Sequence, residues 1–407
     1  MLRSMFSAVS GLRSHQTMMD VVGNNIANVN TSGYKSNSVV FEDLLSQTLR
    51  GAGAPTSEVG GTNPAQVGLG VRAAGIQTSF VQGAAQATGR STDLAIQGDG
   101  FFVVNQGGEQ LFTRAGSLSL DASGRLATVD GAIIQGWGAD PVTGQVNKNA
   151  GIGNLTIPLG QLQQPNPSNE VTVAGNLPAA AAIGTTTRSS ITVYDASGDA
   201  VNLVVQFEKT AADQWSVTTD GAATEGSGSL TFGADGLPTS YPTVTATLAD
   251  GTAITLNLGS SADALNGVTQ FGGDNNNSVA ATGQNGWTMG FLRSYTIAQD
   301  GTINGVFSNG RTQALGQIAL ATFGNPTGLE RVGNSSFRAT VNSGIPQVGT
   351  AGSASRGLLA GGTLEMSNVD LAAEFTNLIT AQRGFQANSR VISASDELLQ
   401  DLVNLKR

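Results

Sequence analysis

The chain has 407 residues, enough for two or three domains of about 150 residues each and for a sizeable core. Only 12% of the residues are charged and the formal net charge is −9, a balance that repels nucleic acid and anionic membranes. The absence of cysteine excludes disulfides, thiolate metal sites and cysteine nucleophiles. We therefore expect no nucleic acid partner, no membrane insertion, and a stability that comes from packing or assembly.

The first 32 residues predict an amphipathic helix. Their apolar residues recur at alternating steps of three and four, as in the seam of a coiled coil. The members of this stripe are Leu2, Met5, Val9, Leu12, Met19 and Ile26. A helix rich in Gly, Ser and Asn is marginal alone, because packing supplies most helical stability. The stripe therefore requires a partner.

This helix ends in an asparagine-rich stretch, DVVGNNIANVNTSGYK (20–35). Asparagine disfavours helix interiors because its amide competes for backbone hydrogen bonds. Asn24 and Asn28 share one face, and with Asn25 we expect them to bond to a partner helix or a neighbouring subunit while Ile26 stays in the apolar seam. The alternative is an ordinary frayed helix end closed by the following Ser-Gly pair.

Two stretches rich in Gly, Ser, Pro and Ala, 50–70 and 342–362, lie just inside the terminal helical patterns. Their composition is typical of linkers, with the glycines of the first stretch at Gly51, Gly53, Gly60, Gly61, Gly68 and Gly70. Two ordinary flexible connectors would explain them. Their mirrored placement indicates instead a chain that leaves one layer, visits another and returns.

Between these stretches the pattern is β throughout. Short apolar runs separated by Gly, Asp and Asn predict linked hairpins over 94–138, and the same pattern recurs at 191–219, at 243–259 and from 286 to about 337. The two DASG sequences, at Asp121 and Asp195, lack the oxygen spacing of a calcium loop and are expected to be hairpin turns.

The C-terminus predicts a second amphipathic helix. Its stripe consists of Leu371, Phe375, Leu378, Phe385, Ile392 and Leu399. Ser367 is the expected N-cap, and Lys406 and Arg407 would complement the negative end of the helix dipole. We expect the two terminal helices to pair with each other, although docking on the β domains as ordinary core helices is the alternative. Two helices cannot cover both stripes fully, which predicts a polymer.

Catalytic chemistry finds little support in the sequence. His15 is the only histidine and lies within a helical pattern, and the GYKS sequence (33–36) lacks the Gly-Lys pair of a phosphate loop. Carboxylates are scattered through the β region without a distinguished pair. We therefore expect no enzyme, and no catalytic, cofactor-binding or metal-ligating residues.

Several stretches together resemble bacterial flagellar axial proteins, the family of rod and hook subunits. They are AVSGL (8–12), the asparagine-rich stretch (20–35), GRSTDLAIQGDGFFVV (89–104), SNVDLAAEFTNLITAQRGFQANSRVI (367–392) and the final DLVNLKR. Within the family, the length and the central block ITVYDASGDAVNLVVQFEK resemble the hook branch.

The resemblance implies a mainly β fold with α-helical termini and a nested, multidomain chain. Its parts would be a terminal helical domain (1–32 and 365–407), a linker region (33–70 and 355–364), a middle β domain (71–147 and 285–354) and an outer β domain (148–284). The paired helices would form a coiled-coil-like inner tube, and the outer domain would be inserted in the middle one.

The resemblance also implies a function, that of a hook subunit. Copies would polymerise into a curved, flexible tube that acts as a universal joint between motor and filament, exported by the flagellar type III apparatus to an extracellular position. The implied partners are other copies, the distal rod, the hook cap, the hook-filament junction proteins and the export apparatus. A distal-rod subunit is the alternative within the family, since the 50–70 stretch is long; a secreted β-rich adhesin is the alternative from another class.

Overall fold

The computed structural model describes residues 2–55, 60–141, 143–158, 160, 162–260, 266–272 and 277–404. Contacts between Cα atoms divide the chain into two units. The first comprises Met1–Ile157, Thr296–Asn304 and Ala314–Arg407, and the second comprises Pro158–Tyr295 and Gly305–Gln313. In chain order the second unit is thus inserted in the first, with its first boundary ten residues beyond the expected 147/148 division.

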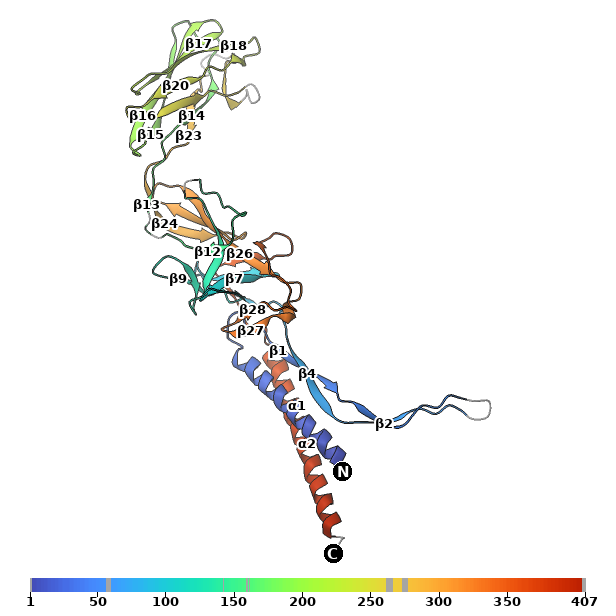
Figure 1. Cartoon of the computed structure of the whole chain (residues 1–407). Coiled ribbons are helices and arrows are strands. Elements are labelled where there is room, and N and C mark those ends of the chain that lie inside the picture. Colours follow the sequence, from blue (N-terminus) through green and yellow to red (C-terminus); the bar gives the residue numbers. More distant parts are fainter. Residues whose placement is uncertain are drawn as a thin grey trace. The chain divides into compact units, whose positions relative to one another are not determined.

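The first unit begins and ends with the two long helices, α1 (Leu2–Ala27) and α2 (Leu371–Asn404). They pack along each other, as Figure 1 shows in blue and red, which confirms the predicted pairing of the chain ends. Of the helices described, neither is long and apolar enough to span a membrane.

The N-cap of α2 is Asp370, not Ser367 as the sequence predicts. Oδ1 of Asp370 accepts hydrogen bonds from the backbone N–H groups of Ala372 (2.9 Å) and Ala373 (3.3 Å). Ser367 lies three residues too early, and its hydroxyl accepts only from Val369 outside the helix. An aspartate stabilises this helix start in two ways, because it accepts backbone hydrogen bonds and its negative charge lies at the positive end of the helix dipole. The expected basic residues Lys406 and Arg407 lie outside the described residues.

The stretch predicted to be a flexible connector contains paired strands. β1 (Asn37–Asp43) pairs antiparallel with β4 (Val71–Thr78), and β2 (Ser46–Arg50) pairs antiparallel with β3 (Ala65–Gly68). We call these four strands the ribbon. Gly51, Gly53, Gly60 and Gly61 lie between β2 and β3, whereas Gly68 ends β3 and Gly70 separates it from β4. β4 lies in the region predicted to be β, whereas β1, β2 and β3 lie in the predicted linker region 33–70. These three strands escaped prediction because both faces of the ribbon are largely exposed, so no apolar alternation marks them.

The second predicted connector, 342–362, also contributes strands to the first unit. β29 (Gln347–Thr350) pairs with β26, β30 (Leu358–Gly361) pairs with β6 (Leu94–Gln97), and the following β31 (Thr363–Glu365) pairs with β5 (Ala85–Ala87). The pairings of β30 with β6 and of β31 with β5 join segments more than 250 residues apart. Such partners leave no signal in local composition.

The main sheet of the first unit follows the order β26-β11-β7-β8-β28-β27, all antiparallel. Its strands and their neighbours are β7 (Phe101–Gln106), β8 (Glu109–Thr113), β9 (Leu118–Leu120), β10 (Leu126–Thr128), β11 (Ile133–Gly138), β12 (Gly153–Asn154), β25 (Thr302–Phe307), β26 (Thr312–Thr322), β27 (Glu330–Gly333) and β28 (Ser336–Arg338). Phe101, Phe112, Phe323 and Phe337 meet edge-on or tilted in its core, with ring centroids 4.8–5.9 Å apart.

The second unit is built from two five-stranded sheets around one apolar core. One sheet has the order β15-β16-β17-β18-β19, and the other has β20-β21-β14-β22 with β23 beside β14. The strands of these sheets are β14 (Glu170–Asn176), β15 (Thr186–Tyr194), β16 (Ala200–Ala211), β17 (Gln214–Asp220), β18 (Ser227–Phe232), β19 (Pro238–Ser240), β20 (Val244–Thr247), β21 (Ala253–Asn257), β22 (Val268–Thr269) and β23 (Ala280–Gln284). β13 (Leu162–Gln163) and β24 (Gly290–Ile297) pair with each other outside these two sheets. Phe207 and Trp215 are completely buried between the sheets.

The predicted hairpins agree with these strands. The DASG sequence at Asp121 joins the antiparallel pair β9 and β10, and the one at Asp195 joins β15 and β16. In both turns Oδ1 of the aspartate accepts backbone N–H groups two and four residues on, at 2.8–2.9 Å, and the glycine adopts a positive φ. The turn interpretation of both sequences is confirmed.

Candidate assembly surfaces and the helix junction

The two terminal helices meet through small residues. Ala8, Gly11 and Ser14 are buried on α1. A Cβ atom placed on Gly11 would lie only 2.6 Å from Nδ2 of Asn388, and one placed on Gly384 would collide with the ring of His15. The helices run antiparallel, because a step of four residues from His15 back to Gly11 matches a step of four from Gly384 on to Asn388. A glycine on each helix therefore makes room for a side chain of the other helix, Gly11 for Asn388 and Gly384 for His15.

The predicted apolar stripe of α1 lies one residue away from this seam. Met5, Val9, Leu12, Met19 and Ile26 are half-buried, whereas the residues directly before three of them, Ala8, Gly11 and Asn25, are buried. One residue is a rotation of about 100° around a helix. Small residues such as Ala8 and Gly11 lie buried in the contact between the helices, and the larger apolar side chains of the predicted stripe lie beside it. Leu2 begins α1, but its side chain lies outside the described residues.

The stripe of α2 is likewise divided between the helix contact and solvent. Leu378, Ile392 and Leu399 are half-buried, whereas Phe375 is 51% exposed. Leu371 and Phe385 are also exposed. Phe6, Ile379 and Leu398, which the heptad pattern does not include, add to the exposed apolar surface of the helix pair. Large apolar side chains exposed in this number on one pair of helices favour a partner that covers them.

The asparagine-rich stretch fastens the end of α1 to its surroundings. Nδ2 of the buried Asn25 donates to the Asn37 carbonyl (2.7 Å) and to Oε1 of Glu374 on α2 (3.0 Å), and its Oδ1 accepts from the N–H of Asn37 (3.0 Å). The Tyr34 hydroxyl donates to Oδ1 of Asn24 at 2.8 Å. Asn25 therefore joins α1 to both α2 and the ribbon.

Asn28 has a more local role. Its Nδ2 donates to the carbonyl oxygen of Asn24 (2.9 Å) and to the Asn24 side chain (3.1 Å), within the same helix end. Gly33, at φ +68°, then turns the chain and donates its N–H to the Glu365 carbonyl at 2.8 Å. The expected Ser-Gly closure of the helix end is thus also a contact with the strand that leads into α2.

Beside this helix end lies a buried ionic group, which we call the junction cluster: Lys35, Arg114 and Glu365. Nζ of Lys35 donates to Oε1 of Glu365 (2.7 Å) and to the Val81 carbonyl (2.8 Å). Nη1 of Arg114 reaches Oε2 of Glu365 at 3.4 Å. The side chains of Lys35 and Glu365 are each 1% exposed and that of Arg114 is 3% exposed. The single carboxylate of Glu365 is thus the counter-charge of two buried cations.

Electrostatics of the junction cluster reflect its burial. Burial lowers the pKa of Lys35, while the hydrogen bond and the negative charge of Glu365 act to raise it. Burial also lowers the pKa of Arg114. Each cation depends on Glu365 to offset the loss of its hydration. The pKa shifts thus follow from the burial of these side chains and from their contacts with one another.

A polar cavity of about 440 Å³ lies next to the junction cluster. It is lined mainly by hydroxyl and amide side chains from 28–34, 113–117, 128–130 and 331–336. Arg331 forms part of its wall, donating from Nη2 to the Lys35 carbonyl (2.6 Å) and lying 4.5 Å from the centroid of the Tyr34 ring. Among the described residues, no group of three or more His, Asp or Glu side chains is arranged to hold a metal ion.

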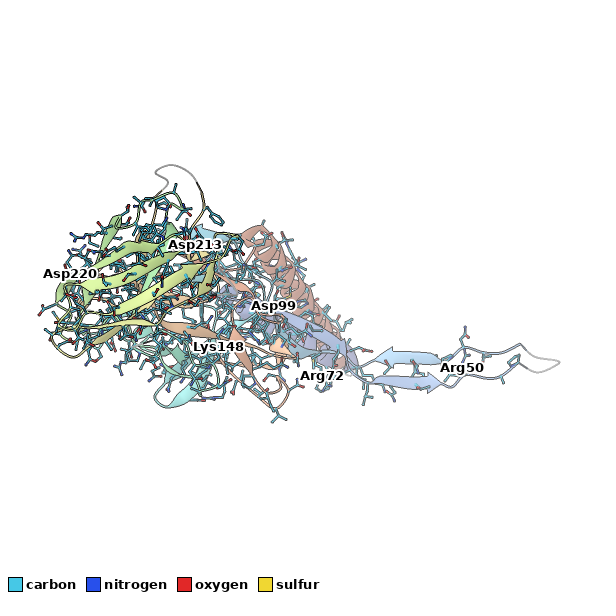
Figure 2. The ribbon with its side chains drawn as sticks, turned by 90° about the horizontal axis from the view of Figure 1, so that it is seen from above. Arg50, Arg72, Asp99, Lys148, Asp213 and Asp220 are labelled. Atoms are coloured by element: carbon cyan, nitrogen blue, oxygen red, sulfur yellow. The ribbon has the colours of Figure 1, made fainter. Side chains whose placement is uncertain are left out.

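The ribbon contacts α1 at the start of β4. Oγ of Ser10 accepts the N–H of Val71 at 3.2 Å, and a side chain on Gly70, at φ +120°, would collide with Ser10. Figure 2 labels Arg72, which lies on the ribbon near this contact, and Arg50, which lies farther along the ribbon from α1. Along the ribbon, Val40, Leu45, Leu49, Val67, Leu69 and Ile76 are exposed. A lone two-stranded ribbon is marginally stable in water, so this apolar surface also favours a partner.

Comparisons with known proteins agree over the whole chain. Four family models match: Flagella basal body rod protein at 5–35, Flagellar hook protein FlgE/F/G D1 domain at 95–224, Flagellar basal body protein FlaE D2 domain at 167–287, and Flagellar basal body rod FlgEFG protein C-terminal at 360–405. These descriptions define a non-enzymatic structural protein of the flagellar rod and hook.

Similar proteins indicate the hook branch of this class of flagellar proteins. The flagellar hook protein FlgE of Treponema pallidum is 40% identical over all of both chains, and that of Salmonella typhimurium is 37% identical over 99% of this chain and all of its own. The basal-body rod protein FlgG of Bacillus subtilis is 32% identical over all of both chains. The chain belongs to the flagellar hook protein family and is a structural subunit of the flagellar hook.

A solved structure shares the fold. The crystal structure of Helicobacter pylori flagellar hook protein FlgE2 superposes with a TM-score of 0.57 at 15% identity, over 69% of this chain and all of that one. This likeness supports the mainly β fold predicted from the sequence.

Proposed function

We propose that this chain polymerises through its helix pair and ribbon into a curved tube that transmits motor torque to the filament. The observation that supports it is the apolar surface left exposed on α1 and α2, including Phe6, Phe375 and Leu398. Identical copies packed alongside would bury these side chains, each worth roughly 1.5–3 kcal/mol when withdrawn from water. The terminal helices would then form the inner layer of the tube.

A rotating bent tube requires each row of subunits to lengthen and shorten once per turn. The β surfaces of both units are rich in Ser, Thr, Asn and Gly and carry few charges. Small polar groups exchange hydrogen bonds with water at little net cost, so such surfaces can slide against each other. We propose that the inner helices hold the tube together while contacts of this kind provide its compliance.

Export through the flagellar type III apparatus fits the composition of α1. Its Gly, Ser and Asn content makes an isolated helix marginal, so this end of the chain can travel unfolded and become helical in the polymer. We propose an extracellular position in the hook, with the distal rod, the hook cap and the hook-filament junction proteins as further partners.

Electron microscopy of polymers formed by the purified full-length chain tests this proposal. We expect curved tubes with a central channel, and straight, unbending tubes would favour the distal-rod alternative. The Bacillus subtilis rod relative aligns over the full chain, so length does not separate these alternatives. The match of 167–287 to the FlaE D2 domain description favours the hook.

A charge on the exposed helix face provides a second test. Phe375→Asp is expected to abolish the tubes while leaving the monomer folded, because Phe375 lies in solvent in the monomer and would be buried in the polymer. Gln386→Asp, also on an exposed position of α2, is the control for added charge. Tubes formed by Phe375→Asp at the wild-type concentration would contradict the proposal.

A further inference from the structure

The loop of residues 339–346, between β28 and β29, presents two large apolar side chains to solvent. Val341 is fully exposed and Ile345 is 85% exposed. Single exposed apolar residues are normal on protein surfaces, but two such residues within five positions of one short loop form a surface that gains from being covered. We call residues 339–346 the β28-β29 loop.

Hydrogen bonds within the β28-β29 loop fix its turn. Ser343 is 1% exposed, and its hydroxyl donates to the Thr340 carbonyl and accepts the Thr340 N–H, both at 2.9 Å. The Thr340 hydroxyl accepts the N–H of Asn342 at 3.2 Å. A buried serine thus closes the turn from inside while the aliphatic side chains point outward.

Hydrogen bonds join the β28-β29 loop to a second turn, at residues 325–328. Asn325 donates from its backbone to the Ser343 carbonyl (3.3 Å) and from its side chain to the Asn342 carbonyl (3.1 Å), and the Thr340 hydroxyl donates to the Gly328 carbonyl (2.6 Å). A Cβ atom on Gly328 would lie 2.8 Å from the backbone of Asn342 and Ser343. The two backbones are therefore in close contact, which holds the loop in one shape.

A preorganised apolar loop binds without first having to lose conformational freedom. Pro346 adds to this, because the residue before a proline, here Ile345, is restricted to extended conformations. The sequence ATVNSGIP (339–346) contains no charge, whereas the chain as a whole carries −9. Copies of an acidic chain repel one another, so a contact between copies is favoured at a neutral, apolar surface.

We propose that the β28-β29 loop is a contact by which one copy of this chain binds a second copy in the polymer, with Val341 and Ile345 as its anchors. This inference rests on the proposed polymerisation, in which every copy has identical neighbours. Because successive copies in a tube are related head to tail, the loop of one copy meets a different surface on the next.

The double variant Val341→Ser plus Ile345→Ser tests the contact. The concentration of full-length chain needed for polymer, measured by sedimentation, should rise at least about tenfold, because burying one aliphatic side chain changes an equilibrium constant by an order of magnitude or more. Asn342→Ser, on the same loop, is the matched control and should stay within about twofold of wild type. A double variant that polymerises like wild type would overturn the proposal.

Site-specific crosslinking identifies the occupant independently of stability. Since the sequence has no cysteine, Ile345→Cys introduces a single thiol for a photoreactive label. In purified polymer we expect a product of twice the chain mass, absent from dilute monomer. A labelled polymer without that product, or with one formed only when another flagellar protein is added, would refute a second copy as the occupant. A wild-type chain that never polymerises would instead refute the proposed function.

Discussion

Among the residues that the structure describes, Glu365 is the only carboxylate that contacts both buried cations of the junction cluster, Lys35 and Arg114. Glu365→Gln would leave both cations buried without a counter-charge, and breaking a buried pair in this way costs about 3–5 kcal/mol. We therefore expect the free energy of unfolding of the first unit to fall by about 3 kcal/mol or more, measured by denaturant titration.

A solvent-exposed ion pair on the ribbon supplies the matched control. Glu42 pairs with Arg72, and both side chains are well exposed. Glu42→Gln should change the free energy of unfolding by less than about 1 kcal/mol, because water and ions screen such pairs. Equal losses for Glu365→Gln and Glu42→Gln would show that burial of the junction cluster does not matter for stability.

Asp250 confers a predictable acid sensitivity on the second unit. The hydroxyl of Thr252 and the N–H groups of Ala196 and Thr252 donate to its carboxylate and lower its pKa from 3.8 to about 2. A carboxyl group with a lower pKa in the folded state stabilises that state above pH 3.8, and this contribution is lost as the pH falls toward 2.

Thermal unfolding between pH 5 and 2 measures this contribution. Wild type should lose stability across the window, and Asp250→Asn should show a shallower loss because its amide does not titrate. Asp213→Asn, at an exposed acidic residue of the same unit, is the control and should keep the wild-type slope. Identical slopes for Asp250→Asn and wild type would contradict the assignment.

At the scale of elements, the contact between α1 and α2 depends on the absence of side chains at specific positions. Gly11→Leu should destabilise the helix pair by about 1–3 kcal/mol, because the new side chain collides with Asn388. At Gly23 a Cβ atom would meet nothing within 4 Å, so Gly23→Leu should gain up to about 1 kcal/mol of helix propensity. Thermal melting followed by circular dichroism at 222 nm compares the two. A Gly11→Leu protein as stable as Gly23→Leu would refute the close-packed seam.

At the scale of the whole molecule, the second unit is an insert with its own core. Asn166 and Trp287 exchange backbone hydrogen bonds of 3.0 and 2.9 Å, so the two ends of the intervening chain lie side by side. The core between them includes Phe207 and Trp215 and lies entirely within 171–279. A polypeptide of residues 164–289 should therefore fold alone.

Tryptophan fluorescence reports the folding of that fragment. Trp215 is fully buried, so the folded fragment should emit at shorter wavelength than the denatured one and unfold in one cooperative step. The Trp215→Phe fragment should lose most of that change while keeping the cooperative step in circular dichroism. A fragment that shows no cooperative transition would mean that the second unit depends on the rest of the chain.

The sequence by itself determined the elements whose causes are local. Three-four periodicity predicted both terminal helices, and the DASG sequences predicted the hairpin turns at Asp121 and Asp195, because each signal lies within a few residues of the structure it produces. The family signatures at the chain ends likewise indicated a flagellar protein. The N-cap of α2 was misplaced from Asp370 to Ser367, since two capping residues stand close together there.

The tertiary structure decided everything that depends on distant partners. The contact between the two helices uses the face of α1 that contains Gly11 rather than the predicted apolar stripe, because Gly11 leaves the space that the Asn388 side chain of α2 occupies. The pairing of the glycine-rich stretches into strands and the meeting of Lys35 with Glu365 join segments that local patterns do not connect. Lys35 and Glu365 are 330 positions apart in the sequence, and only folding brings them together and withdraws them from water. No local sequence pattern therefore predicts this buried ion pair.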